Sequence, residues 1–180
     1  MSDVYDCRDN DDLTNDEHFD NFKIAGLPGE TTQRSYCVAQ LQSESGEPEQ
    51  IFTRPNASGV FTSERICDDF AKYYKDNKQS GKTLIVYTNY SPTWRCPEVW
   101  MDLQEKYDIE IEMRAASPYA RGESEVKEML RSNKHIRLNA FRPNDWQVVA
   151  NMIKEPHIPP SAERLAADAK AQAVFNSWRN

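Results

Sequence analysis

The chain has 180 residues, of which 38% are hydrophobic and 28% are charged, and its formal net charge is -7. This is the length of one ordinary domain, with enough apolar residues for a core. No apolar stretch approaches the roughly 20 residues of a membrane span, and the acidic N-terminus lacks the basic start of a signal peptide. The four cysteines form no CxxC pair, which favours free thiols in a reducing compartment. We therefore expect a soluble intracellular protein, cytoplasmic or nuclear, with no membrane partner.

The negative charge is concentrated at the N-terminus. Residues 1–20 contain eight acidic residues and one basic residue, and removing these from the totals of 29 acidic and 22 basic residues leaves 21 of each. Acidic stretches of this kind are typical of solvated tails, so we assign residues 1–16 to a disordered tail and 17–180 to a single domain. The neutral body lacks the basic excess that usually marks nucleic-acid-binding proteins.

Hydrophobic periodicity and chain breakers predict two helices and a hairpin in the first half of the chain. Apolar residues at helical spacing indicate a helix over residues 16–24. Alternating residues predict strands over 36–42 and 50–54, which a polar turn connects. A second helix follows over 62–76, with Thr62 or Ser63 as its capping residue.

The second half of the chain alternates strands and helices. The continuously apolar run TLIVYT predicts a strand over 83–88 that is buried on both faces of a sheet. The later predicted elements are a helix over 97–106, a strand over 109–114, a helix over 124–133, a strand over 136–141 and helices over 144–153 and 162–178. A hairpin followed by such alternation indicates an α/β fold, an α-β-α sandwich with a five-stranded mixed sheet and about six helices.

Two short segments precede or begin predicted helices. They are FTSE at residues 61–64 and YSPTWRC at residues 90–96. Zinc deaminases of nucleic acids carry H-x-E followed by P-C-x-x-C, in which the His and both Cys hold the metal and the Glu moves protons. Here Thr62 stands at the His position and Thr93 at the first Cys position, and only Glu64 and Cys96 match. Because both segments begin helices over one edge of the sheet, we expect Glu64 and Cys96 to lie close together.

The surroundings of these segments resemble the AID/APOBEC-like polynucleotide cytidine deaminase family. The run 90–92 (YSP) resembles the family's Trp-Ser-Pro stretch. The strand that ends at Arg114, with Tyr119 in the following loop, resembles the strand and recognition loop that choose the base context. Residues 136–153 resemble the family's fifth strand and the helix after it. The resemblance covers residues 17–178 as a pattern of elements, and it implies a cytidine-deaminase-like sandwich in a member with degenerate zinc ligands.

The missing ligands argue against zinc chemistry. A catalytic zinc site needs three protein ligands of N, S or carboxylate type, and the metal lowers the pKa of its bound water to about 7. We therefore expect no cofactor, and zinc only if the site is rebuilt. Glu64 is then either a remnant proton shuttle or a carboxylate that interacts with the helix dipole. Cys67, one turn further on, is either a core residue or, with Cys96 and a distant histidine, part of a rebuilt site. The histidines all lie outside the two segments: His18, His135 and His157.

Aromatic and basic residues are expected around the cleft where the two motif segments meet, and they leave open the binding of nucleic acid. Single strands bind by stacking bases on aromatic rings and by contacts to arginine. The candidates are Arg34, Arg54, Asn56, Tyr90, Trp94, Arg95, Arg114, Tyr119 and Arg121. The Trp94–Arg95 pair is equally compatible with an ordinary surface loop.

Three functions are compatible with the sequence. The leading hypothesis is a catalytically inactive pseudo-deaminase that binds single-stranded DNA or RNA weakly, or a protein partner. The alternative is an active cytidine deaminase of single-stranded DNA or RNA with a rebuilt zinc site. The third is a structural or regulatory subunit that pairs with an active relative, because a fold by itself does not fix a function.

Overall fold

The computed structural model describes residues 15–30, 35–55, 62–76, 82–157 and 159–180. The helices are α1 (Asn15–Ile24), α2 (Thr62–Asp76), α3 (Cys96–Tyr107), α4 (Glu123–Ser132), α5 (Asp145–Ile153) and α6 (Ala162–Trp178). The strands are β1 (Tyr36–Gln42), β2 (Pro48–Pro55), β3 (Thr83–Tyr90), β4 (Glu110–Ser117) and β5 (Ile136–Ala140). Every predicted helix and strand is confirmed, while β2, β3 and β4 run up to three residues beyond their predicted ends. A short 3-10 helix, Ala120–Gly122, lies in the segment predicted as a loop.

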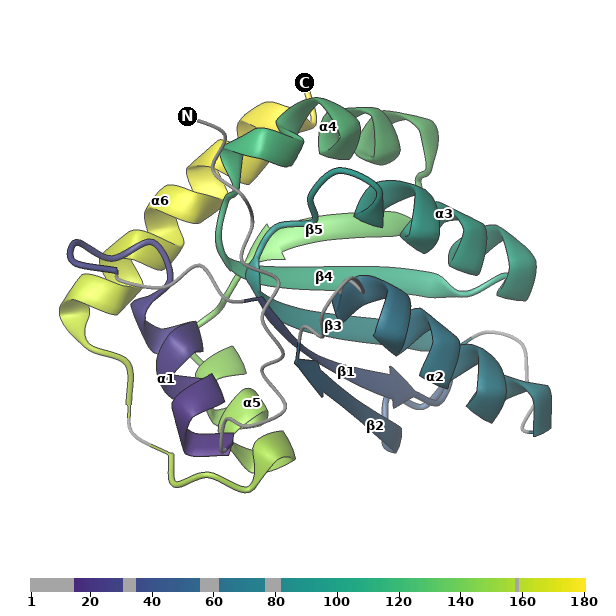
Figure 1. The fold of residues 1–180 in the computed structure, drawn as a ribbon, viewed down its shortest axis with the longest axis horizontal. Helices are drawn as coiled ribbons and strands as arrows, with labels where there is room; N and C mark the ends of the chain where they lie inside the picture. Colours follow the sequence, from purple (N-terminus) through teal and green to yellow (C-terminus); the bar gives the residue numbers. More distant parts are fainter. Residues whose placement is uncertain (1–14, 31–34, 56–61, 77–81, 158) are drawn as a thin grey trace.

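The five strands form one mixed sheet in the order β2-β1-β3-β4-β5. Strand β1 pairs antiparallel with β2 and β3, whereas β3, β4 and β5 run parallel. Parallel neighbours need crossover connections, which α3 and α4 supply. The carboxyl ends of β3, β4 and β5 therefore meet at one edge of the sheet, together with the loops that follow them (Figure 1). This arrangement confirms the α/β prediction and is consistent with a cytidine-deaminase-like sandwich.

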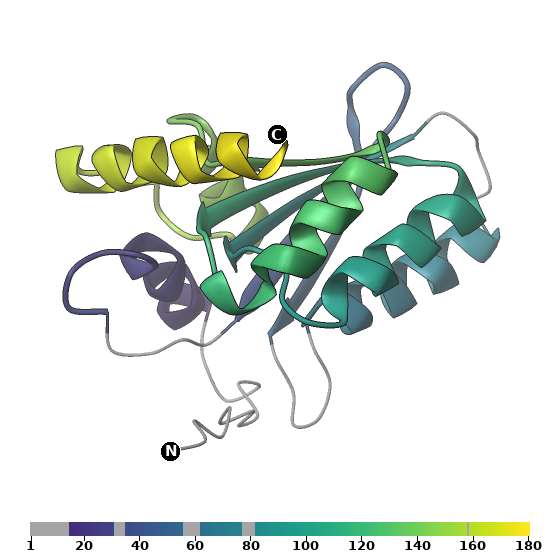
Figure 2. The same cartoon turned by 90° about the horizontal axis from the view of Figure 1, so that it is seen from above.

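Alternate strand residues face two different helix layers. On one face, Cys37 and Met113 belong to a core to which α2, α3 and α4 contribute. On the other face, Val38 and Tyr87 pack in a second core with residues of α1 and α5. Figures 1 and 2 show α2, α3 and α4 together on one side of the sheet. Helix α6 joins the two cores. Phe175 of α6 lies in the first core, and Arg164 in the first turn of α6 donates to the Lys23 carbonyl of α1.

Helix ends follow local sequence signals. The Ser161 hydroxyl accepts a hydrogen bond from the Arg164 N–H (3.1 Å) and so caps the start of α6. Pro97 stands in the first turn of α3, where its missing N–H leaves no helical bond unmade. Asp108 ends the same helix in the left-handed conformation, with φ of 51°. These signals fix where the elements that carry the candidate site begin and end.

Helix α1 is the first element that the structure describes. It begins at Asn15, so the expected boundary between residues 16 and 17 falls inside it. Phe19 and Phe22 are buried and hold α1 against the sheet. Most of the predicted tail, residues 1–14, lies outside the described residues. Within the described residues, no helix is both long and apolar enough to cross a membrane.

Candidate functional site

The two motif segments meet at the starts of two adjacent helices. Thr62 is the first residue of α2 and Cys96 is the first residue of α3, and these helices contact each other. A hydrogen bond from the Cys96 N–H to the Thr93 carbonyl (2.9 Å) closes the turn before α3. Inside this turn Trp94 adopts a left-handed conformation, with φ of 47°. The predicted proximity of Glu64 and Cys96 is confirmed, because α2 contacts α3 and Ser63, the neighbour of Glu64, hydrogen-bonds to Cys96.

The three positions that correspond to zinc ligands supply one good donor. Thr62 is buried, and its hydroxyl lies 3.4 Å from the Ser35 hydroxyl and 3.5 Å from the Ser35 carbonyl oxygen. Thr93 is half-buried and hydrogen-bonds to Cys96. Hydroxyl groups are poor zinc ligands, so Cys96 alone matches the chemistry that the metal requires.

The surroundings of Cys96 keep its sulfur protonated. Burial raises the pKa of the Cys96 thiol and the Glu64 carboxylate raises it further, whereas hydrogen bonds with Ser63 and Thr93 lower it in part. The Ser63 hydroxyl also accepts a hydrogen bond from the Trp100 indole N–H (3.1 Å). Zinc binds the thiolate, so a metal at this position would have to displace the Cys96 proton.

Three thiols lie near one another at this site, and two of them, Cys67 and Cys96, are close enough to Glu64 to feel its charge. Cys37 comes from β1, Cys67 from α2 and Cys96 from α3, and all three are buried free cysteines. Burial is the main cause of the raised pKa at Cys37 and at Cys67. The proximity of Cys96 adds to it at Cys37, and the proximity of Cys37 and Cys96 adds to it at Cys67. The interpretation of Cys67 as a core residue is confirmed, because it packs in the same cluster as Ile66 and Phe70. Cys37 was missed, although the alternation of β1 directs it toward α2.

The described histidine side chains do not complete a metal site. The Nδ1 atom of His135 lies 2.6 Å from the Glu110 carboxylate, at the amino ends of β4 and β5. Cys96 follows the carboxyl end of β3, which is the opposite edge of the sheet. His157 is exposed in the connection to α6, and the His18 side chain lies outside the described residues. Across the described segments, no three His, Cys, Asp or Glu side chains are placed to hold a metal ion.

Several candidate binding residues form an exposed rim beside this site. Trp94 is 49% exposed, and Arg95 and Arg121 are also exposed. Tyr119 is half-buried, with its ring centroid 5.9 Å from that of the buried Tyr90. The rim therefore presents one accessible indole, one partly accessible phenol and two guanidinium groups. We call Trp94, Arg95, Tyr119 and Arg121 the rim.

The two loops that carry the rim are tightly packed together. The Ser91 N–H donates to the Ser117 carbonyl (2.9 Å), and the Ser91 hydroxyl accepts from the Tyr119 N–H (2.8 Å). A Cβ atom on Gly122 would lie 2.7 Å from both the Pro92 carbonyl oxygen and the Thr93 Cα. Only glycine fits this approach, so the relative position of the two loops is fixed by backbone contacts.

Arg114 does not join the rim, contrary to expectation. Its side chain is buried on the face of the sheet that packs against α1 and α5, because its neighbour Met113 occupies the other face. The guanidinium pairs with the Glu112 carboxylate and lies 3.7 Å from the Asp145 carboxylate. Tyr90 is also buried. Arg34 and Asn56 lie outside the described residues, and only the backbone of Arg54, in β2, is described.

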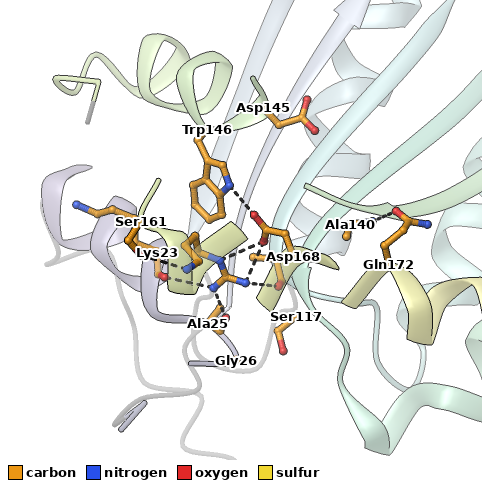
Figure 3. Close-up of polar contacts among 12 residues, drawn as sticks. Lys23, Ala25, Gly26, Ser117, Ala140, Asp145, Trp146, Ser161, Asp168 and Gln172 are labelled. Atoms are coloured by element: carbon orange, nitrogen blue, oxygen red, sulfur yellow. Dashed lines mark hydrogen bonds and ion pairs between the residues drawn. The ribbon is translucent and has the colours of Figure 1, made fainter. Parts of the chain in front are cut away.

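A buried ion pair connects the end of β4, which leads into the loop with Tyr119, to three helices, and sequence reasoning missed it. The Arg164 guanidinium pairs with Asp168 (3.0 Å) and donates to the carbonyls of Lys23 (3.2 Å), Ala25 (2.5 Å) and Ala116 (2.9 Å). Asp168 also accepts from the Trp146 indole N–H (2.9 Å), as Figure 3 shows. This network, which we call the latch, connects α1, α5 and α6 to the end of β4. Its sequence signal was an oppositely charged pair at i and i+4 in α6.

The comparisons with known proteins assign no family to the chain. No family model matches the sequence, and no curated protein matches it significantly. The resemblance to the deaminases thus depends on the motif segments and on the order of the elements.

Proposed function

We propose that this protein is a catalytically inactive AID/APOBEC-like pseudo-deaminase that acts by binding. One observation supports this most directly: the three ligand positions contain two threonine hydroxyls and one thiol with a raised pKa. Without a metal to lower the pKa of a water beside Glu64, hydroxide is not supplied for attack on a base. Glu64 then acts as a polar residue at the start of α2.

The rim is the proposed binding surface. An exposed indole flanked by arginines suits the stacking and charge contacts that hold single-stranded DNA or RNA. Trp and Arg are also the residues most often found at the centre of protein interfaces, so a protein partner or an active relative fits as well. We place this activity inside the cell, since the three described cysteines are free thiols rather than disulfides.

Zinc analysis tests the proposal. Protein purified without chelators should contain far less than one zinc per chain and should leave cytosine in single-stranded DNA and RNA unchanged. Restoring the ligands with Thr62→His and Thr93→Cys should recover metal binding, because both positions lie at the helix starts beside Cys96. The matched control, Thr62→His with Thr93→Ser, should remain metal-poor.

One result would favour the alternative of an active enzyme. The observation on its side is that Cys67 lies near two further thiols, Cys37 and Cys96, and near the Glu64 carboxylate. One tightly bound zinc per unmodified chain, lost in Cys67→Ser, would replace the pseudo-deaminase proposal with a rebuilt zinc site.

A further inference from the structure

Strand β5 is the last strand on one side of the sheet in the part of the chain that the structure describes. Its backbone groups alternate between β4 and the outer edge. The His135 carbonyl accepts from the Ile111 N–H of β4 (2.9 Å). By alternation, the backbone groups of Leu138 and Ala140 point away from β4. One residue of a further parallel strand would bond to both the Leu138 carbonyl and the Ala140 N–H.

Two side chains from the C-terminal end of the chain take the place of such a residue. The Gln172 side-chain oxygen accepts from the Ala140 N–H (2.9 Å; Figure 3). Arg179, directly after α6, donates to the Leu138 carbonyl. Both side chains also donate to the Asn139 side-chain oxygen, Arg179 at 2.7 Å and Gln172 at 3.3 Å. One acceptor and one donor therefore meet the outward groups of β5, and a shared contact joins them.

The segment that carries these two side chains is anchored independently of the edge. Phe175 and Trp178 of α6 are buried, and their ring centroids lie 5.2 Å apart. Arg131 of α4 donates to the Asn180 carbonyl (2.9 Å), just beyond the end of α6. Helix α6 also contacts both β4 and β5. Packing of the helix thus holds the side chains in position beside β5.

We infer that Gln172 and Arg179 seal the β5 edge and prevent it from pairing with a strand of a second copy. An edge strand with unpaired backbone groups is a template for pairing with another chain, and charged side chains at the edge oppose this. Here the outward donor and acceptor are already bonded, so an incoming strand would have to displace both side chains. This inference is independent of the proposed function.

Amide hydrogen exchange, followed by NMR, tests the seal at a single atom. In Gln172→Ala the Ala140 N–H loses its acceptor, so it should exchange roughly tenfold faster, the order expected for one ordinary hydrogen bond. Gln172→Glu keeps an oxygen acceptor and should leave the exchange close to that of the unmodified chain. The Asn139 amide, which by the same alternation faces β4, is the internal control and should not change. Equal Ala140 exchange in Gln172→Ala and in the unmodified chain would overturn the inference.

Opening the edge tests the consequence of the seal. The double variant Gln172→Ala with Arg179→Ala removes both side chains, and it makes the net charge of -7 more negative by one unit, which opposes association. Sedimentation velocity should nevertheless show larger species than the unmodified chain forms at the same concentration. The matched control, Glu163→Ala with Lys170→Ala, changes two exposed residues of α6 at the same spacing and should sediment like the unmodified chain. A folded double variant that sediments like the control would overturn the inference.

Discussion

Removing the carboxylate of Asp168 should destabilise the domain strongly. The perturbation is Asp168→Ala, which takes away the ion-pair partner of Arg164 and the acceptor of the Trp146 indole N–H. Both charged side chains are almost fully buried, with 3% and 5% exposed, so solvent does not compensate for the loss. The carbonyls of Lys23, Ala25 and Ala116 would still bind Arg164, but they cannot neutralise its charge.

The expected loss in the free energy of unfolding is about 3–5 kcal/mol. This is the effect of leaving one member of a buried ion pair without its partner. The same substitution also leaves the Trp146 N–H without an acceptor. The cost of this, roughly 1–3 kcal/mol, is partly included in the loss from breaking the ion pair and does not add in full. Asp168→Asn keeps one oxygen acceptor and should fall between the wild type and Asp168→Ala. Because the pair is buried, the effect should change little with salt.

Urea unfolding followed by circular dichroism and tryptophan fluorescence measures this loss. Glu163→Ala, at an exposed position of the same helix, is the matched control and should change stability by less than about 0.5 kcal/mol. Replacing both charges, with Arg164→Met and Asp168→Leu, should recover part of the loss because no unpaired charge remains. A loss of less than about 1 kcal/mol for Asp168→Ala would refute the view that the latch holds these elements together.

Three further predictions concern the site. The free energy of unfolding should fall as the pH rises above about 9, by roughly 1.4 kcal/mol per pH unit for each buried thiol. The reason is that Cys67 and Cys96 ionise in the unfolded chain, while burial raises their pKa and keeps them protonated in the folded chain. Urea titrations at pH 8 to 10 should show a shallower fall in Cys67→Ala. Gly122→Ala should destabilise the domain by about 1–3 kcal/mol, because its Cβ would overlap the backbone of the preceding loop; a neutral effect would mean that the loops separate easily. If the rim binds single strands, Trp94→Ala should weaken binding by about 1–3 kcal/mol, and the affinity of the unmodified chain should fall steeply with salt. Fluorescence anisotropy with labelled oligonucleotides measures both effects. An affinity that Trp94→Ala leaves unchanged would place the contact elsewhere.

The fold was predictable because its signals are local. The apolar run of β3, the helical spacing in α2 and the breakers before α6 each depend on neighbouring residues. The strand ends were less predictable, because β4 continues to Ser117 through Ala115 and Ala116, which are small residues without strong strand preference. Their place is fixed by pairing with β3 and by the latch contact to Ala116, and both depend on residues distant in sequence.

The site was predictable only where the order of elements determined it. Two helices that follow neighbouring strands must start close together, so the meeting of Glu64 and Cys96 could be expected. Predicting the direction of the Arg114 side chain would have required the register of β4 and the position of its partner Asp145, which lies in α5. The alternation of β1 gives the face of the sheet on which Cys37 lies, but its nearness to Cys96 depends on the pairing of β1 with β3.

The starts of α2 and α3 are held together by contacts that need no metal. Trp100 of α3 donates to Ser63 of α2, and Cys96 hydrogen-bonds to the same Ser63. Thr62 satisfies its hydroxyl with Ser35, just before β1. These hydrogen bonds, together with the packing of α2 against α3, fix the two helix starts relative to each other through groups of the chain itself. The position of Glu64 beside Cys96 therefore follows from contacts between neighbouring residues.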